Sequence, residues 1–411
     1  MNWKHVSLGE ISVNIQTGPF GSQLHQSDYS EKGTPVVMPK DLISGHISEE
    51  SIARVSDDHV ERLSRHKIEV GDILYSRRGD VGRCAFASET EAGWLCGTGC
   101  LRVTIDSRKA NPKFVFYQLL KADTIGWVEK HAVGSTMLNL NTSILSSVPI
   151  DLPSHDKQNH IVGVLSAYDD LIENNQKQIK LLEEAAQRLY KEWFVDLRFP
   201  GHETTPIVDG VPDGWTYKPF SEVFDYVRGK SYTSKELSDT TGILMANLKN
   251  IRAFGGYNRN AEKRFTGQYK ANQMLYAGDI VMGVTDMTQE RRLVGHVALV
   301  PDLGEKMTFS MDLIKIIPKL TDNLFLYSAM YYGGLSKQIS PLANGVNVLH
   351  LKPEAMMGIE MLIPTKDILE RYHQQFAPMV TRIEASQKQC DVAAEARDRL
   401  IPKLMNREIE V

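Results

Sequence analysis

Apolar residues recur at alternating spacings of four and three along two long stretches of the chain. The first stretch runs from Ile161 to Trp193 and the second from Tyr372 to Leu404. This spacing is typical of a coiled-coil seam, in which one side of a helix packs against another helix. The first seam consists of Ile161, Leu165, Tyr168, Ile172, Asn175, Ile179, Leu182, Ala186, Leu189 and Trp193. The second consists of Tyr372, Phe376, Met379, Ile383, Ser386, Cys390, Ala393, Arg397, Leu400 and Leu404.

A helix with one apolar stripe must bury that stripe against something. We expect the two helices to pair antiparallel within the chain, with Asn175 and Ser386 at equivalent seam positions that fix the register. Two alternatives stay open, because each helix could fold back on its own domain or form an intermolecular dimer. A helix over residues 155–193 would be on the order of 55 Å long at 1.5 Å per residue, which makes it a spacer.

The two seams belong to an internal repeat. "VGDILYS" at residues 70–76 returns as "AGDIVMG" at residues 277–283. "GSTMLNLNTSILSSVPIDLP" at residues 134–153 matches "GVNVLHLKPEAMMGIEMLIP" at residues 345–364, an offset of 211. Trp3 and Trp215 begin the two copies. The chain is therefore written as two similar units in the same order.

The segments before the helices have a mixed α/β pattern. Short β-branched runs such as "DILYS" and "DIVMGV" are separated by Gly, Asp and Pro turns, and "NPKFVFYQLLKA" and "DNLFLYSAMYYGGLSKQI" predict helices. The predicted fold class is α/β (α+β), with two such domains separated by two long antiparallel coiled-coil helices and related by a pseudo-two-fold repeat. The predicted boundaries are 1–153 and 214–364 for the domains, 154–198 and 365–411 for the spacer helices, and 199–213 for the linker.

Composition places the chain among soluble globular proteins. It has 411 residues, a hydrophobic fraction of 42%, a charged fraction of 24% and a net charge of −4, which argues against a surface that binds polyanions everywhere. Four cysteines without a framework pattern fit a reducing cytoplasm. The first eleven residues lack the pattern of a signal peptide, and no apolar run is long enough to span a bilayer.

Catalytic motifs are not found, so the sequence predicts a non-catalytic recognition protein. "NPKF" at residues 111–114 lacks the second proline of an amino-methyltransferase loop, and no Gly-x-x-x-x-Gly-Lys-Ser/Thr phosphate loop is present. Cys84, Cys96 and Cys100 with His131 have spacings too wide for a usual metal site, and the second copy lacks these residues. Small buried thiols are the favoured interpretation.

Arginines follow the repeated Gly-Asp strand in both copies. "SRRGDVGR" at residues 76–83 contains Arg77, Arg78 and Arg83, and "TDMTQERRLVG" in the second copy contains Arg291 and Arg292. Paired arginines on a loop can contact guanine edges bidentately or bind phosphates. Recurrence at the same place in two otherwise divergent domains favours nucleic-acid contact over a plain solvated charge run.

Further polar loops supply the remaining candidates for nucleic-acid contact. "TGPFGSQL" at residues 17–24 and "RGKSYTSKEL" at residues 228–237 are loops in which backbone N–H groups could approach phosphates, although each could equally be a tight turn. "GSTMLNLN" and "NGVNVLHL" precede short helices, so their asparagines could also be helix caps. The candidates from these four segments are Gln23, Ser135, Thr136, Asn139, Lys230, Tyr232, Asn344 and Asn347.

With these features together, the full chain resembles the specificity subunit of a type I restriction-modification system. "LYKEWFVDLRFPGHE" at residues 189–203 resembles the central conserved region of that family. "GPFGSQL", "VGDILYSRRGDVGR" and "GSTMLNLN" resemble the framing motifs of its target-recognition domains, and "VPDGWTYKPFSEVF" resembles the start of a second one. The order of these motifs, repeated twice, carries the resemblance.

The resemblance implies that each α/β domain recognises one half of a split double-stranded DNA target in the major groove. It implies helices that set the spacer and dock two methylation subunits, with two restriction subunits in the full enzyme. S-adenosylmethionine, ATP and Mg would then be held by those partner subunits and no cofactor by this chain. Trp193, Phe194 and Phe199 are expected to anchor the helix end against the neighbouring domain or to dock a methylation subunit.

Two rival interpretations belong to other classes of protein. A non-catalytic scaffold could bind protein or RNA through two domains on a helical strut. A fused nuclease or methyltransferase would need the motifs that were sought and not found. Copurification of a DNA adenine methyltransferase would favour the specificity subunit.

Overall fold

The computed structural model describes residues 3–20, 23–49, 51–134 and 138–410. The chain separates into two compact units. The first unit consists of Met1–Asn174 with Cys390–Val411, and the second consists of Asn175–Gln389. These divisions fall inside the two long helices, whereas the sequence had placed the boundaries at the helix ends. Each unit is therefore built from one α/β domain, the start of one long helix and the end of the other.

The first unit contains two four-stranded sheets. One has the order β2-β11-β8-β9 and is antiparallel throughout. The other has the order β10-β4-β7-β3, with β10 and β4 parallel. Shorter pairs join β1 to β12 and β5 to β6. The strands are β1 (Lys4–Ser7), β2 (Ser12–Thr17), β3 (Tyr29–Ser30), β4 (Thr34–Val37), β5 (Leu42–Ile43), β6 (His46–Ile47), β7 (Ala53–Val55), β8 (Ile73–Ser76), β9 (Cys84–Phe86), β10 (Leu95–Cys96), β11 (Cys100–Ile105) and β12 (Pro149–Leu152).

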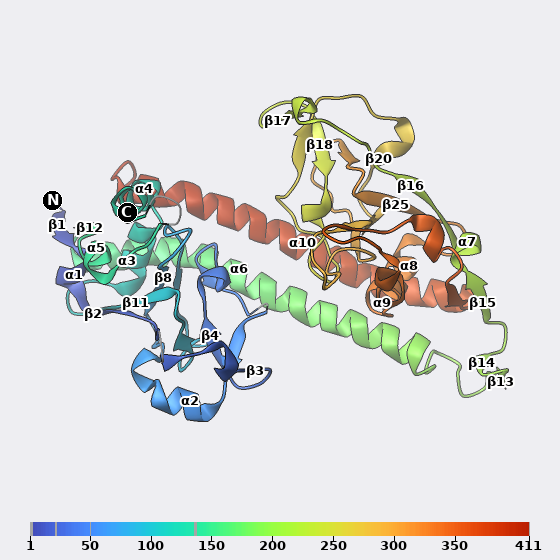
Figure 1. Ribbon diagram of the computed structural model, residues 1–411, viewed down its shortest axis with the longest axis horizontal. Helices are drawn as coiled ribbons and strands as arrows, with labels where there is room; N and C mark the ends of the chain where they lie inside the picture. Colours follow the sequence, from blue (N-terminus) through green and yellow to red (C-terminus); the bar gives the residue numbers. More distant parts are fainter. Residues whose placement is uncertain (1–2, 21–22, 50, 135–137, 411) are drawn as a thin grey trace. The chain divides into compact units, whose positions relative to one another are not determined.

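Short helices complete the first unit (Figure 1). They are α1 (Leu8–Ile11), α2 (Asp57–Arg62), α3 (Pro112–Leu119), α4 (Ala122–His131) and α5 (Thr142–Ser146). The side chain of Asn111 accepts hydrogen bonds from Lys113 N and Phe114 N, so it caps α3. The end of the chain belongs to the same core, because Ile401, Leu404 and Met405 pack with the buried residues of this domain.

The second unit repeats this architecture. Its sheet β16-β25-β21-β23 has the same order and antiparallel pairing as β2-β11-β8-β9. A five-stranded sheet, β17-β19-β18-β24-β20, contains the parallel pair β18 and β24, and β15 pairs with β27 as β1 does with β12. Its strands are β13 (Ile207–Val208), β14 (Val211–Pro212), β15 (Thr216–Pro219), β16 (Phe224–Arg228), β17 (Leu237–Ser238), β18 (Ile243–Ala246), β19 (Lys263–Phe265), β20 (Met274–Leu275), β21 (Ile280–Gly283), β22 (Thr285–Asp286), β23 (Val297–Leu299), β24 (Met307–Phe309), β25 (Leu313–Pro318), β26 (Leu349–His350) and β27 (Glu360–Ile363).

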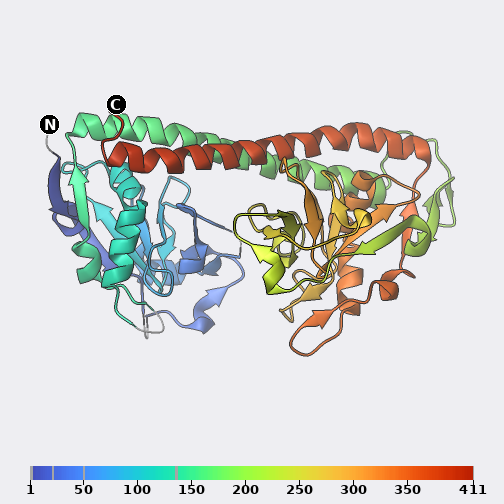
Figure 2. The ribbon, with the colours of Figure 1, turned by 90° about the horizontal axis from the view of Figure 1, so that it is seen from above.

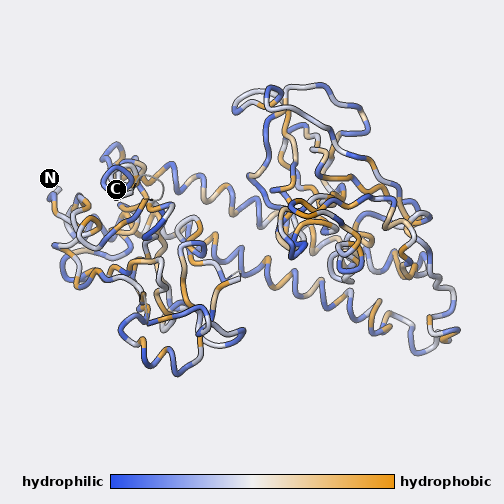
Figure 3. The backbone as a smooth tube through the Cα atoms, viewed as in Figure 1, coloured by the Kyte–Doolittle hydropathy of each residue, from blue (hydrophilic) through white to orange (hydrophobic). Residues whose placement is uncertain are grey.

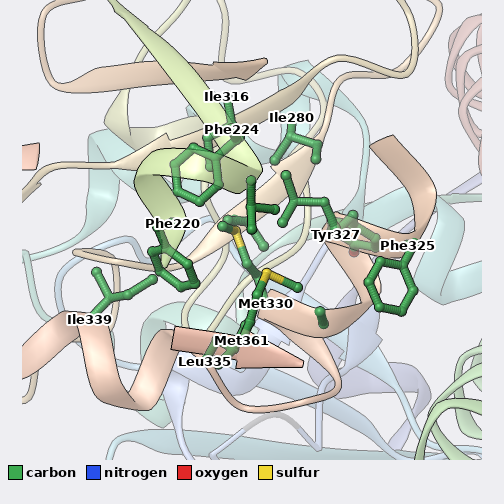
Figure 4. Packing of buried hydrophobic residues seen from close by; sticks show 14 of the residues in the cluster. Phe220, Phe224, Ile280, Ile316, Phe325, Tyr327, Met330, Leu335, Ile339 and Met361 are labelled. Atoms are coloured by element: carbon green, nitrogen blue, oxygen red, sulfur yellow. The ribbon is translucent and has the colours of Figure 1, made fainter. Parts of the chain in front are cut away.

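The core of the second unit is rich in aromatic and sulfur-containing side chains. Figure 4 shows Phe220, Phe224 and Met330 converging with Ile280 and Met361. Its short helices are α7 (Phe220–Val223), α8 (Asn323–Tyr331) and α9 (Ser336–Ile339). The sequence predicted one helical segment over "DNLFLYSAMYYGGLSKQI", but the structure has two helices there. The chain breaks between them at Gly334, which has a φ of +74° that glycine adopts readily.

The aromatic residues at the end of the first long helix are part of this core. The side chains of Trp193 and Phe199 are only 5% and 3% exposed. The ring of Phe194 lies 4.9 Å from that of Tyr372 and 5.1 Å from that of Phe325, and Phe199 lies 4.8 Å from Trp215. The three residues therefore anchor the helix end against the neighbouring domain. Of the two roles expected of these residues, the structure shows the anchoring role, and docking of a methylation subunit stays a prediction.

The two long helices are α6 (His155–Tyr190), which is followed by a π-helical turn at Lys191–Val195, and α10 (Lys366–Met405). Apolar positions recur along both in Figure 3. Every seam residue predicted above is buried or half-buried. In the part of the chain that the structure describes, no helix has the length and apolarity to cross a membrane.

Within each unit the two helices run antiparallel. In the first unit, Cys390 Sγ donates to Ile172 O at 3.6 Å, and Arg397 contacts Asp169. In the second unit, Ser386 Oγ donates to Gln178 Oε1 at 3.1 Å, and the rings of Tyr190 and Tyr372 are 6.4 Å apart. In both units the residue number rises on one helix as it falls on the other.

A buried ionic cluster fixes the helix pair of the first unit. Arg397 Nη1 donates to Asp169 Oδ1 at 2.8 Å, and Tyr117 OH donates to Asp169 Oδ2 at 2.5 Å. Lys113 Nζ lies 3.6 Å from the same carboxylate. Arg397 and Asp169 are 4% and 6% exposed, so their charges depend on one another. The charged residue Arg397 at an otherwise apolar seam position is thus accommodated by an ion pair.

The second unit has no charge at the matching positions. Val380, Ala186 and Ser328 occupy the places of Asp169, Arg397 and Tyr117 at the offset of 211. In that unit the two helices meet instead through the buried rings of Tyr190 and Tyr372. The two helix pairs therefore use different chemistry in the same frame.

Replacing Arg397 by alanine should strand the buried carboxylate of Asp169. We expect R397A to lower the free energy of unfolding by about 3 kcal/mol, the typical cost of breaking a buried pair. Denaturant unfolding of the full chain measures this loss. The double variant with D169V and R397A carries the residues of the second unit and should recover much of it. A double variant no more stable than R397A would show that the loss does not come from an unpaired charge.

Candidate nucleic-acid interface

In the first unit, backbone hydrogen bonds join the connection after β8 to the segment before α5. Arg77 N donates to Gly99 O at 2.8 Å, and Leu140 N donates to Arg77 O at 2.8 Å. Val133 and Asn139 exchange two further bonds of 3.0 and 2.8 Å. We call this arrangement the loop junction. It brings Arg77, Arg78 and Asn139, predicted from separate motifs, to one place.

The loop after β2 adjoins the same junction. Gly18 N donates to Cys100 O at 3.0 Å, and a Cβ atom on Gly18 would lie 1.9 Å from Gly97 O, so only glycine fits. Phe20 is 54% exposed, and the guanidinium carbon of Arg77 lies 5.9 Å from the centre of its ring. Gln23 Oε1 accepts from Phe20 N at 3.4 Å, which holds the side chain of Gln23 in this loop.

The three predicted arginines of the first unit differ in their freedom to bind a ligand. Arg78 is exposed, and its backbone pairs with Asn139. Arg83 is exposed but its Nε donates to Asp80 Oδ2 at 2.6 Å. Arg77 is half-buried, and its Nε and the Oδ1 of Asn139 are buried with no hydrogen-bond partner among the residues that the structure describes. Arg78 is the arginine best placed to reach a base or phosphate.

The second unit has the same loop junction. Val284 N donates to Asp312 O, and Leu351 N donates to Val284 O, both at 2.8 Å. Asn344 and His350 exchange the bonds that Val133 and Asn139 exchange in the first unit. The strands β22 and β26 extend the contact by pairing Thr285 with His350. In Figure 2 the orange loops at the lower edge of this unit lie on the side away from the long helices.

Asp286 organises the connection after β21. Its buried carboxylate accepts hydrogen bonds from Thr288 N and Oγ1 at 2.8 Å, from Leu293 N at 2.6 Å and from Val294 N at 3.1 Å. Burial raises the pKa of Asp286, but these hydrogen bonds outweigh burial and hold the pKa below its usual value. The conformation of this connection is therefore fixed by hydrogen bonds to one buried carboxylate.

The structure corrects the equivalence of the two arginine pairs. Val284 and Thr285 occupy the junction positions of Arg77 and Arg78, whereas Arg291 and Arg292 come later in a longer connection. Both later arginines are half-buried, and within the described part of the chain each Nε is buried and has no hydrogen-bond partner. Arg292 also pairs with Glu290. Both units contain a pair of adjacent arginines after this strand, but the two pairs do not occupy equivalent positions in the structure.

Other candidates of the second unit lie around the junction. Lys230 pairs through its backbone with Ser310, next to the segment that contacts Val284. Tyr232 lies farther along the loop after β16, where its hydroxyl accepts from Lys263 Nζ at 3.0 Å. Asn344 and Asn347 are exposed.

The structure also decides which asparagines cap helices. The cap of α5 is Asn141, whose side chain accepts from Ile144 N at 2.8 Å, so Asn139 does not fill that role. The residue before the 3₁₀ turn at Pro353–Met356 is Lys352, so Asn347 is not a cap either. Ser135 and Thr136 lie outside the described residues.

The cysteines do not form a reactive site. Cys84, Cys96 and Cys100 are buried free thiols, and burial raises the pKa of Cys84 and of Cys96 to about 12. His131 is exposed on α4 and bonds through Nδ1 to Trp127 O at 2.7 Å. Among the described residues, no group of three His, Cys, Asp or Glu side chains is arranged to hold a metal ion.

Comparison with known proteins shows which family this chain resembles. A family model for the type I restriction modification DNA specificity domain matches residues 1–184. The MjaIX specificity subunit of a type I restriction enzyme from Methanocaldococcus jannaschii is 27% identical over 92% of this chain and 87% of its own length. The HindI specificity subunit from Haemophilus influenzae is 22% identical over 99% of this chain and 100% of its own length. Over nearly its whole length, this chain is similar to type I restriction enzyme specificity subunits.

A solved structure agrees with the fold of this family. The crystal structure of the type I restriction-modification system S subunit from M. genitalium has a TM-score of 0.57 and 14% identity. The match covers 98% of this chain and 96% of that one. The matched domain and the full-length relatives indicate a DNA sequence-specificity subunit of a type I restriction-modification system, and the alternative of a protein- or RNA-binding scaffold is not favoured.

Sequence reasoning missed a buried histidine beneath the first loop. His66 is 2% exposed, and its Nε2 accepts from Arg65 Nε at 3.0 Å. The carbonyl of Arg65 accepts in turn from Gln16 Nε2 at 2.6 Å, on the strand that leads into the loop of Gly18. Burial lowers the pKa of His66 to about 4, with help from the charges of Arg65 and Arg102. No spacing in the sequence signalled this contact.

The stability of the folded chain should depend on pH through His66. The unfolded chain takes up this proton near pH 6.5 and the folded chain only near 4, so folding loses stability as pH falls between those values. We expect the free energy of unfolding to fall by about 2 kcal/mol more in the native chain than in H66Q between pH 7 and pH 5. Denaturant titrations at both pH values measure it, and equal losses in the two proteins would contradict the assignment.

Proposed function

We propose that each unit of this specificity subunit binds one half of a bipartite DNA target through its loop junction. The observation that carries the proposal is the repeated backbone frame with different side chains at its tip. Leu140 N to Arg77 O and Leu351 N to Val284 O are matching bonds in the two units. A constant frame with variable side chains suits two sites of one kind that recognise different base sequences.

The chemistry of the exposed groups supports contact with base edges and phosphates. The guanidinium of Arg78 can bind a guanine bidentately or clamp a phosphate. Glycine-shaped loops such as that of Gly18 let backbone N–H groups approach the DNA backbone closely. A net charge of −4 limits how much phosphate contact this chain can supply alone, which fits a complex that shares the DNA contacts.

In this proposal the chain is the non-catalytic member of a larger complex. Two methylation subunits dock on the long helices and hold S-adenosylmethionine, and two restriction subunits supply ATP- and Mg-dependent cleavage and translocation. The long helices set the number of unread base pairs between the half-sites. This role of the helices is supported by their length, because α6 and α10 are continuous over 36 and 40 residues.

Replacement of one recognition domain tests the division of labour. Exchanging residues 1–150 for the matching domain of a relative should alter one half of the methylated sequence and leave the other half unchanged. Sequencing of methylated sites in cells that express the chain with its methylation subunits measures this. The reciprocal exchange of residues 214–364 is the matched control and should alter the other half. Changes in both halves from one exchange would contradict modular recognition.

Lengthening both helices tests the spacer. One heptad adds about 10.5 Å of helix, which equals about three base pairs of B-DNA at 3.4 Å each. Inserting a heptad in α6 near Asn174, with a matching heptad in α10 near Gln389, should lengthen the spacer by about three base pairs and keep both half-sites. Sequencing the sites that the variant methylates measures the spacer. An unaltered spacer would show that the helices do not set its length.

A further inference from the structure

The loops of the second unit carry large apolar side chains at their tips. Val346 is 87% exposed, Met287 is 75% exposed and Met311 is 57% exposed. Single exposed apolar residues are ordinary on protein surfaces. These three, however, lie on three segments that meet at one loop junction, so we call them the apolar tip.

Hydrogen bonds connect the segments that carry the apolar tip. Met287 and Val346 lie beyond the ends of the paired strands β22 and β26. Gln289 Nε2 donates to Val346 O at 2.7 Å, which ties the two loops together. Met311 N donates to Lys230 O at 2.9 Å, and the next residue, Asp312, accepts from Val284 N.

The tip is held in shape before any ligand binds. Gly345 has a φ of +152°, and a Cβ atom there would lie 1.9 Å from Val348 O, so the turn that presents Val346 needs glycine. On the other loop, the carboxylate of Asp286 holds Thr288, Leu293 and Val294. Preorganised loops lose little conformational entropy on binding.

The surroundings of the tip suit DNA. The exposed residues beside Val346 are Asn344, Asn347 and His350, which carry no acidic group. Lys230 adjoins Met311, and the acidic Glu290 pairs with Arg292. Asp312, the residue after Met311, is half-buried, and its carboxylate accepts from Ser310 Oγ at 3.4 Å. Val346 and Met287, which lie away from this carboxylate along the chain, are the part of the tip best suited to approach the floor of a groove between phosphates.

We infer that Val346 and Met287 contact the C5-methyl group of a thymine in the major groove of the half-site that the second unit binds. The inference rests on the proposed function, because it assumes that the loop junction meets base edges. Thymine is the one base of DNA whose major-groove edge carries a methyl group. The first unit presents Arg78 at the position of Thr285, so its half-site is recognised by polar contacts instead.

Exchange of thymine for deoxyuridine removes that methyl and nothing else. Each thymine of the methylated motif is replaced in turn, and binding by the assembled complex is measured. We expect one exchange within the half-site of the second unit to weaken binding about fourfold, the factor that one buried methyl group supplies. Val346 is exposed, so V346A should fold normally. In the V346A complex the same exchange should weaken binding less, and M287A tests the second proposed contact in the same way. V208A changes an exposed valine of the linker and is the matched control.

The outcomes separate this inference from the proposed function. A complex indifferent to every exchange overturns thymine recognition, while specific binding still supports the function. An equal loss in native and V346A complexes also overturns it, because the methyl would then be contacted elsewhere. Weaker assembly of V346A with its partner subunits, without altered recognition, would assign the tip to a protein contact. Loss of sequence-specific binding by the native complex would refute the proposed function itself.

Discussion

The apolar stripe of each long helix has to be covered, and the rest of the structure depends on how the chain covers it. In the first unit the stripe of α6 meets the end of α10, and Ile401, Leu404 and Met405 complete that unit's core. In the second unit the stripe of α10 meets the end of α6, and Tyr190 and Trp193 complete its core. Neither α/β domain has a complete core without a segment from the other repeat. Helix pairing and domain folding are therefore one event in each unit.

The same frame is stabilised by different chemistry in the two units. The first uses the buried pair of Asp169 and Arg397, and the second uses stacked and edge-on rings around Tyr372. A buried charge tolerates only its own partner, whereas an aromatic cluster tolerates only rings of suitable volume. Each unit is thus matched to its own helix end, although both descend from one pattern. The loop junctions show the same principle, with a repeated backbone and divergent tips.

Periodic and local features could be predicted from the sequence. The seams, the repeat and the strands β8 and β21 follow from spacing and turn chemistry, and the structure has them. Contacts between distant segments could not. Asp169 is one residue from a seam position, and nothing local marks it as the partner of Arg397. Arg291 and Arg292 were aligned with Arg77 and Arg78 because both pairs follow a similar strand. The longer connection of the second copy, shaped around Asp286, moves them elsewhere.

The central claim is that two loop junctions with one frame and unlike tips recognise two unlike half-sites. The most direct measurement is the motif methylated in cells that express this unaltered chain with its methylation subunits. The account predicts an asymmetric sequence in two parts separated by unread base pairs. A single contiguous motif, or a palindrome with identical halves, would contradict it.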